Sequence, residues 1–174
     1  MADVSVRPAR PDDAERMARA QLATWRQAYA DLLPPETLQM PEVQLAAVWL
    51  DAVESPPSPQ HRVLVAMDAA ELVGFAAGVP AQDEDLAPGT LELACLLVEP
   101  RWGRRGHGSR LLAALVEGWR ADGATVAVHW AFEADHVTAD FLTAAGWGHD
   151  GRGRGLDTGP RVVPQRRLHT DVAP

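Results

Sequence analysis

The segment from Leu91 to Leu112 limits the fold of this chain more than any other. It opens with the most apolar run in the sequence, Leu91–Val98, which predicts a buried central strand. Pro100 ends that run, and the turn Gly106-His107-Gly108 then begins a helix that extends to Ala121 with leucines on one face. A buried strand followed closely by an amphipathic helix predicts a domain of mixed α/β architecture.

The start of this predicted helix has the chemistry of a phosphate-binding site. The first N–H groups of a helix have no partner inside it and carry partial positive charge. Glycine lets a phosphate approach these groups without a Cβ in the way. We therefore expect a pyrophosphate to bind at this turn, although a tight turn with a solvated basic surface is the plainer interpretation. The residues expected to bind it are Arg104, Arg105, Gly106, His107, Gly108, Ser109 and Arg110.

Two familiar phosphate-binding patterns do not fit this turn. A Walker P-loop requires a lysine after its last glycine, and the chain contains no lysine. A dinucleotide-binding turn requires a third glycine, whereas Leu111 stands at that position. A nucleotide that binds here therefore requires a different arrangement of the chain.

The remaining periodicities predict one domain over residues 1–174, with its core at about 4–169. A strand at 4–6 precedes two or three helices up to residue 55, and a hairpin follows at 61–79. Beyond Ala121 the pattern predicts a strand at 125–130, a helix at 135–145 and a strand at 161–169. The glycine-rich stretch 148–159 is expected to be a flexible surface loop.

The segment after the buried strand resembles a motif of the GNAT superfamily of N-acetyltransferases. Val98-x-Pro100 followed by Gly106-x-Gly108 is similar to the acetyl-CoA loop of that family, V-x-P-x-x-[R/Q]-x-x-G-x-[G/A]. The resemblance implies that pantetheine pairs with the exposed main chain of Leu96, Leu97 and Val98 like an added strand. It also implies a bulge in that strand, which would leave N–H groups free for the thioester oxygen.

A second block supports the resemblance. The segment from Asp135 to Trp147, which includes Phe141, is similar in spacing to the family's N-x-x-A-x-x-F-Y-x-x-x-G-F. The resemblance implies a single-domain α/β (α+β) GNAT-like fold, with a mixed, mostly antiparallel sheet of six to seven strands and about four helices. It further implies acetyl-CoA as cosubstrate, contacts of Asp135 and Phe141 with it, no metal, and transfer of the acetyl group to a primary amine by direct attack.

Three positions depart from the family pattern. Gly103 replaces the usual Arg or Gln of the loop, Asp135 replaces an Asn, and Leu142 replaces the Tyr that commonly protonates the departing thiolate. These departures keep open an alternative function, that of a catalytically weak acyl-CoA-binding domain.

Several residues are candidates for the proton transfers. Glu92 lies on the buried strand between apolar neighbours, so we expect a raised pKa and a role as general base. His129 is the reserve candidate, with Glu133 after it. Tyr29, the only tyrosine, is the candidate acid, although a packing role is the plainer interpretation. Cys95, the only cysteine, is expected to be an inert thiol.

The charge of the chain bears on its partners. Residues 1–100 carry a net charge of −10 and residues 101–174 a net charge of +2. The acidic segment Asp83-Glu84-Asp85, with Trp25 and Tyr29, is a candidate site for a small-molecule or peptide amine. The overall acidity argues against nucleic acid as a partner. Four arginines of the second half keep that alternative testable, namely Arg152, Arg154, Arg166 and Arg167.

Hydropathy indicates where such a protein resides. No uncharged apolar run reaches the ~18 residues of a membrane-spanning helix, and the N-terminus lacks the apolar core of a secretory signal. We therefore expect a cytoplasmic protein with no membrane partner. A homodimer is common in the family, but nothing in the sequence requires one.

Overall fold

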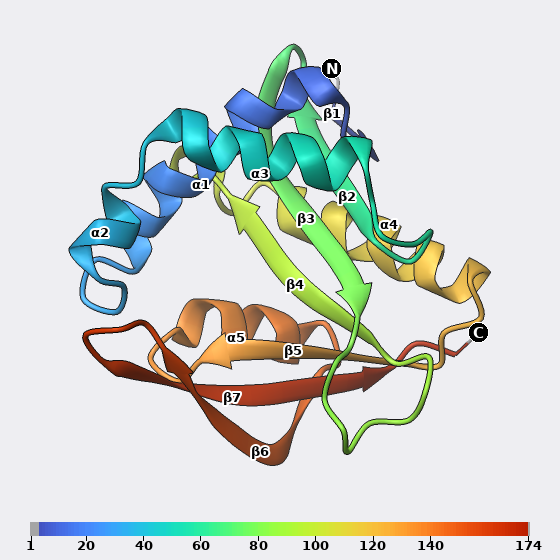
Figure 1. Ribbon diagram of the computed structural model, residues 1–174. Helices are drawn as coiled ribbons and strands as arrows, with labels where there is room; N and C mark the ends of the chain where they lie inside the picture. The colour runs from blue at the N-terminus through green and yellow to red at the C-terminus, as the bar shows by residue number, and fades with distance from the viewer. Residues whose placement is uncertain (1–3, 174) are drawn as a thin grey trace.

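The fold is built on one seven-stranded sheet with the strand order β1-β2-β3-β4-β5-β7-β6 (Figure 1). The computed structural model describes residues 4–173. Neighbouring strands run antiparallel except β4 and β5, which run parallel, so the expected mixed and mostly antiparallel sheet is confirmed. The strands are β1 (Val4–Pro8), β2 (Arg62–Asp68), β3 (Glu71–Pro80), β4 (Leu91–Val98), β5 (Val126–Phe132), β6 (Gly148–Asp157) and β7 (Val162–Asp171).

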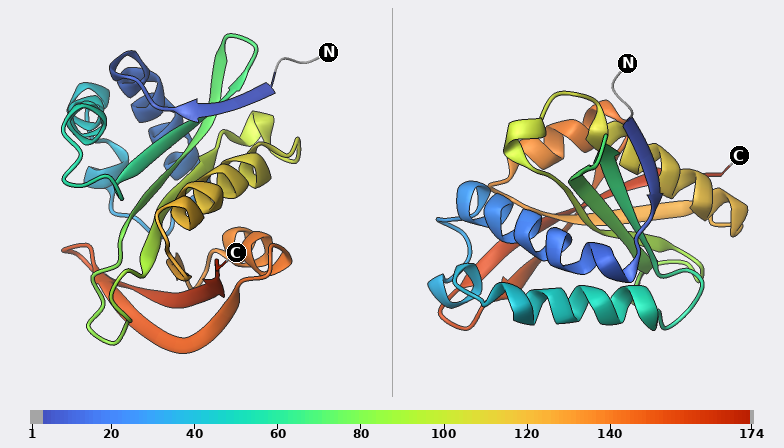
Figure 2. Two further views of the ribbon diagram at one scale, coloured as in Figure 1. Left: turned by 90° about the vertical axis from the view of Figure 1, so that its right-hand side faces the viewer. Right: turned by 90° about the horizontal axis from the view of Figure 1, so that it is seen from above.

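Helices cover both faces of this sheet. The helices α1 and α3 lie over one face of its N-terminal strands, and α4 lies over the other face (Figure 2). The α-helices are α1 (Ala14–Ala28), α2 (Pro35–Leu38), α3 (Glu42–Glu54), α4 (His107–Ala121) and α5 (His136–Ala144), and 3-10 turns lie at Pro11–Asp13 and Pro100–Trp102. None of the helices in the described residues is long and apolar enough to span a membrane.

The apolar face of α4 forms the larger core. Leu111, Leu115 and Trp119 are fully buried there against residues of β4, β5 and β7. A Cβ on Gly78 of β3 would lie 2.8 Å from the Trp119 ring, so the glycine is what lets α4 lie this close to the sheet. A second cluster, centred on Met17 and Phe75, joins α1 to β2 and β3 on the opposite face.

The sheet separates between β4 and β5. The two strands share only the residue pairs Leu91–Ala127 and Glu92–Val128, and beyond Glu92 they diverge (Figure 1). On its other edge β4 remains paired with β3, with one irregularity: Ala77 lies opposite Cys95 while Gly78 lies opposite Leu93. This leaves Ala94 as an extra residue, a β-bulge in the strand where the family resemblance implies one.

The stretch 148–159 is a correction to the sequence prediction. It is not a flexible loop, because residues 148–157 form strand β6, antiparallel to β7. Four of its ten residues are glycines, which have low strand propensity and give no apolar alternation. The strand exists because its main chain pairs with β7 and because arginines on it reach acidic and amide partners.

Candidate active site

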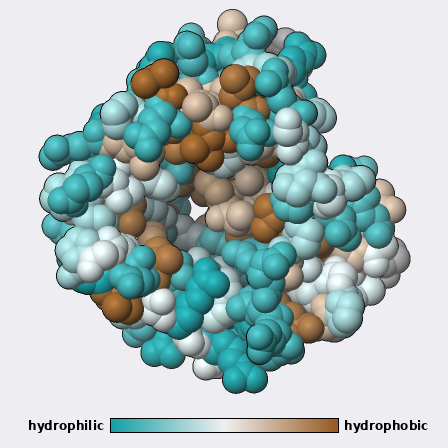
Figure 3. All heavy atoms as spheres, viewed as in Figure 1, coloured by the Kyte–Doolittle hydropathy of each residue, from teal (hydrophilic) through white to brown (hydrophobic). Residues whose placement is uncertain are grey.

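A cleft opens between β4 and β5, and some of the predicted site residues lie along it. From Leu93 to Val98 the edge of β4 that faces β5 has no strand partner. Figure 3 shows a hollow in the middle of this face of the molecule. An unpaired strand edge presents N–H and C=O groups to an incoming extended ligand, as in strand addition. The expected contacts Leu96, Leu97 and Val98 lie along that edge.

His129 lies where the two strands separate. Its Nδ1 is 2.6 Å from the carbonyl oxygen of Leu93. A carbonyl oxygen only accepts hydrogen bonds, so Nδ1 carries the proton and Nε2 holds the lone pair. Burial lowers the pKa of His129, while the Leu93 carbonyl and Asp135 oppose that change. The ring is therefore neutral near pH 7, and it continues the contact between β4 and β5 beyond their last residue pair.

The turn before α4 contains two residues in the left-handed conformation. Gly106 has φ 80° and Arg104 has φ 64°, the latter being unusual for a residue with a side chain. Arg110 donates from Nη1 to the carbonyl oxygen of Arg105 at 3.1 Å. The Arg105 guanidinium lies 4.8 Å from the ring centroid of Trp102. These contacts hold the basic side chains around the N-terminus of α4, where the helix's free N–H groups begin.

His107 differs from its neighbours in this turn. Its side chain is 1% exposed and lies beside Asp68, with Nε2 3.5 Å from a carboxylate oxygen. Its ring also packs edge-on against Trp102. A contact between His107 and a ligand therefore has to come from its main-chain N–H. The main chain of the next residue, Gly108, lies close to the rings and methyl groups of Phe141 and Leu96.

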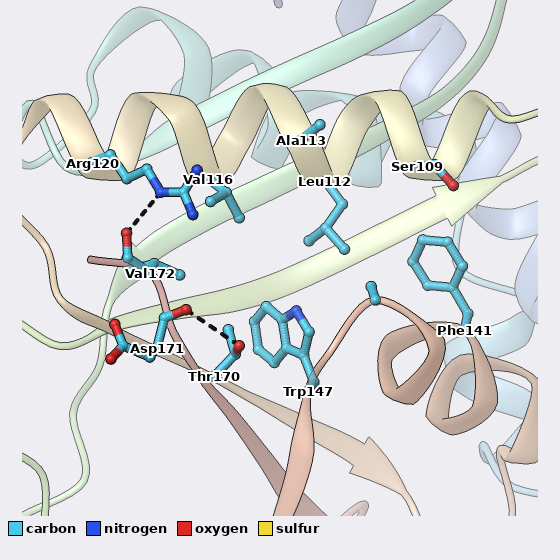
Figure 4. Close-up of a pocket in the computed structure, with 11 residues that line it drawn as sticks. Ser109, Leu112, Ala113, Val116, Arg120, Phe141, Trp147, Thr170, Asp171 and Val172 are labelled. Atoms are coloured by element: carbon cyan, nitrogen blue, oxygen red, sulfur yellow. Dashed lines mark hydrogen bonds between the residues drawn. The ribbon is translucent and has the colours of Figure 1, made fainter. Parts of the chain in front are cut away.

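A groove of about 250 Å³ continues from this turn along α4 (Figure 4). Ser109 and Phe141 lie at one end, and Trp147 points from the opposite wall toward the helix. The groove is lined by Ser109, Leu112, Ala113, Val116, Arg120, Phe141, Ala145, Trp147, Thr170, Asp171 and Val172. Its walls are largely apolar, and it adjoins the predicted phosphate site.

Glu92 lies on the other face of the sheet, the face of α1 and α3. Its neighbours Leu91 and Leu93 are buried against α4, and alternate strand residues point to opposite faces. Burial raises the pKa of the Glu92 carboxyl, as expected, with Arg154 opposing the shift and Asp83 adding to it. The charges of Arg154 and Asp83 therefore act on the candidate base, and the sequence alone did not predict either effect.

Tyr29 joins α1 to the start of α5. Its hydroxyl donates to Asp135 at 2.6 Å, and its ring packs edge-on against Phe132. Asp135 is also the N-cap of α5 and accepts from the Thr138 N–H and hydroxyl. Burial and the carboxylate raise the pKa of Tyr29, so the phenol remains protonated at all physiological pH values. The proton that would make Tyr29 an acid is thus directed at Asp135.

Of the two remaining candidates, Cys95 is inert and Glu133 is held in an ion pair. Burial raises the pKa of the Cys95 thiol to about 12, so little thiolate forms near neutral pH. Glu133 pairs with Arg166 at the surface, with an N–O distance of 3.1 Å.

The acidic segment 83–85 is largely neutralised within the protein. Arg167 donates to Asp85 at 2.7 and 2.9 Å and to Asp150 at 2.6 Å, and its side chain is only 4% exposed. Arg152 pairs with Asp85 as well. Asp83 accepts from the indole N–H of Trp130. Three of the four arginines considered for nucleic acid therefore hold acidic partners.

Comparison with known proteins decides the family. Residues 19–147 match the Acetyltransferase (GNAT) family. The chain belongs to this family. No curated protein sequence is similar enough to count as a relative.

Solved GNAT structures share the fold. The PaiA N-acetyltransferase of Thermoplasma acidophilum, in complex with coenzyme A, is similar with a TM-score of 0.77 at 15% identity, over 97% of this chain and 99% of that one. The yncA protein of Salmonella typhimurium, with its cofactor acetyl-CoA, gives 0.74 at 17% over 97% and 94%. The ribosomal-protein-S18-alanine N-acetyltransferase of Escherichia coli gives 0.66 at 12% over 98% and 95%.

Metal chemistry finds no support in the described residues. Within residues 4–173, no group of three or more His, Cys, Asp or Glu side chains is arranged to hold a metal ion.

Proposed function

We propose that the protein is an acetyl-CoA-dependent N-acetyltransferase that moves the acetyl group directly to a primary amine. One observation carries the proposal. The unpaired, bulged edge of β4 ends, after a short turn, at the N-terminus of α4, where Gly106 and the arginines leave an anion-binding turn. A ligand with an amide-containing arm and a diphosphate fits these two adjacent features, and coenzyme A is such a ligand.

The turn at Arg104–Arg110 would bind the diphosphate through main-chain N–H groups and guanidinium groups. The pantetheine arm would extend along β4, with its amides paired to the main chain of Leu96 and Val98. The adjoining groove, with Phe141 and Ser109 at its near end, is the proposed site for the adenosine portion. Asp135 stays a candidate contact, although both of its carboxylate oxygens already accept hydrogen bonds from Tyr29 and Thr138.

Glu92 is the proposed base. The attacking amine must lose a proton before its lone pair can form the N–C bond, and a carboxylate with a raised pKa is suited to accept that proton, directly or through a water. The amine nitrogen bonds to the thioester carbonyl carbon, the C–S bond then breaks, and coenzyme A leaves as a thiolate. N–H groups freed by the bulge at Ala94 are proposed to stabilise the oxyanion. His129, neutral with a free Nε2, is the alternative base.

The thiolate is proposed to take its proton from solvent. Leu142 is fully buried and has no proton to give. The Tyr29 hydroxyl donates to Asp135 instead. A thiol with a pKa near ~8.5 is an acceptable leaving group at neutral pH without a dedicated acid.

The experiment measures binding and turnover separately. Calorimetry with acetyl-CoA tests the cofactor site, and release of free thiol over an amine panel tests the chemistry. Glu92→Gln should retain acetyl-CoA affinity while kcat falls by about 10²- to 10⁴-fold. Tight binding without turnover on any amine would favour a catalytically weak acyl-CoA-binding domain, and absence of acetyl-CoA binding would refute both.

A further inference from the structure

Arg154 lies on the same face of the sheet as the proposed base. Residues opposite one another on neighbouring strands point to the same face. Glu92 pairs with Val128, and Trp130 lies two residues further along β5. Arg154 pairs with Gln165 of β7, which in turn pairs with Phe132 of β5. These side chains therefore lie on one face of the sheet, and the charge of Arg154 acts on the Glu92 carboxyl.

The guanidinium of Arg154 is held in a fixed orientation. Its Nε donates to Oε1 of Gln165 at 2.7 Å, and its Cζ lies over the Trp130 ring, 4.3 Å from the centroid. Gln165 and Trp130 are themselves only 7% and 8% exposed. A charged side chain supported by two buried groups loses little further conformational freedom when it binds a ligand.

Arg154 differs from its arginine neighbours because it has no carboxylate partner within residues 4–173. Arg152, Arg166 and Arg167 each form an ion pair with an aspartate or glutamate. Arg154 donates one hydrogen bond from Nε and lies over the Trp130 ring, and its two terminal nitrogens donate to no described residue. A planar fork of two donors is the geometry that binds a carboxylate bidentately.

We propose that Arg154 binds the carboxylate of the acceptor, so that the acceptor is a free α-amino acid or a close analogue of one. This inference rests on the proposed function, because it assigns a substrate class to the same site. In an α-amino acid one carbon separates the amine from the carboxylate, so a base and a guanidinium on one surface can hold both groups. A phosphate would need more positive charge than this surface offers, since the neighbouring arginines are already paired.

The test compares the common L-α-amino acids with their α-carboxamides. Calorimetry measures binding of each compound to the enzyme saturated with coenzyme A, and thiol release measures turnover with acetyl-CoA. At least one amino acid should bind and react about 10- to 100-fold better than its amide, which is the effect expected of one charge-assisted bidentate pair.

Matched variants separate a specific role of Arg154 from the effect of removing any positive charge. Arg154→Gln should remove the preference for the carboxylate and leave acetyl-CoA affinity unchanged. Arg161→Gln removes the same charge from the turn between β6 and β7, where the side chain is exposed, and should keep the preference. If amides bind and react as well as amino acids, or if Arg154→Gln keeps the preference, the inference is wrong while the acetyltransferase function stands. If acetyl-CoA does not bind, the proposed function is wrong. Calorimetry of amino acids and their amides with the ligand-free protein then still tests whether Arg154 binds the carboxylate.

Discussion

The charges around Glu92 give the sharpest test of its role. If Glu92 is the base, kcat/KM falls at low pH as its carboxylate takes up a proton. The positive charge of Arg154 lowers the pKa of that carboxyl and the negative charge of Asp83 raises it. Arg154→Gln should therefore move the acidic limb of the pH profile to higher pH, and Asp83→Asn should move it to lower pH.

The size of these shifts follows from Coulomb's law. A unit charge several ångströms away, at the effective dielectric constant of a partly exposed cleft, changes a pKa by about half a unit to one unit. Asn at position 83 can still accept from the Trp130 indole N–H, so this variant keeps the local contact. The assay is kcat/KM against pH between about 5 and 9, with an acceptor that lacks a carboxylate so that Arg154 affects only the electrostatics. If the acidic limb moves in neither variant, or moves in the same direction in both, Glu92 is not the base.

Three further outcomes are expected. Tyr29→Phe, which loses the hydrogen bond to Asp135, should lower the free energy of unfolding in urea by about 1–2 kcal/mol. Arg167→Gln removes the guanidinium shared by Asp85 and Asp150 and should lower the free energy of unfolding in the same assay. The hydrogen bond from Arg167 lowers the pKa of Asp85 to about 2. The stabilisation from this ion pair is therefore complete above pH ~4 and is lost as the pH falls toward 2. In a pH series, the stabilities of wild type and variant should converge in acid. Gly106→Val forces a branched side chain to φ 80° and should raise the calorimetric Kd for acetyl-CoA about tenfold or more.

Most of the fold was predictable because its elements carry apolar periodicity. The central strand Leu91–Val98 and the helix after it bury leucines at the spacing of a strand and of a helix, and both form. The strand β6 carries no such signal. One pattern pointed to it: Gly151-Arg152-Gly153-Arg154-Gly155 alternates with a period of two, as strands do.

The site was less predictable because its contacts join distant segments. Tyr29 and Asp135 are 106 positions apart in the sequence and form one hydrogen bond. Two acidic residues of the first half, Asp83 and Asp85, meet Arg167 of the second half, a pairing that the sequence does not indicate. His107 stands between two glycines in a basic turn, which suggests an exposed side chain, yet the first turn of α4 directs its ring into the protein.

The separation of β4 from β5 affects more than ligand access. Along this line the main chains of Leu91 and Glu92 make the last strand pairing between the two sides of the sheet, with His129 just beyond them. A pantetheine arm in the gap would supply amide groups where a neighbouring strand is missing, so it would serve as a structural component of the sheet. Because only two residue pairs join the strands at this junction, amide hydrogens there should exchange faster than those of β2 and β3 in the ligand-free protein. Ordering this junction would then offset part of the free energy of binding. The affinity measured for acetyl-CoA would therefore depend on the rigidity of the sheet as well as on the contacts with the ligand.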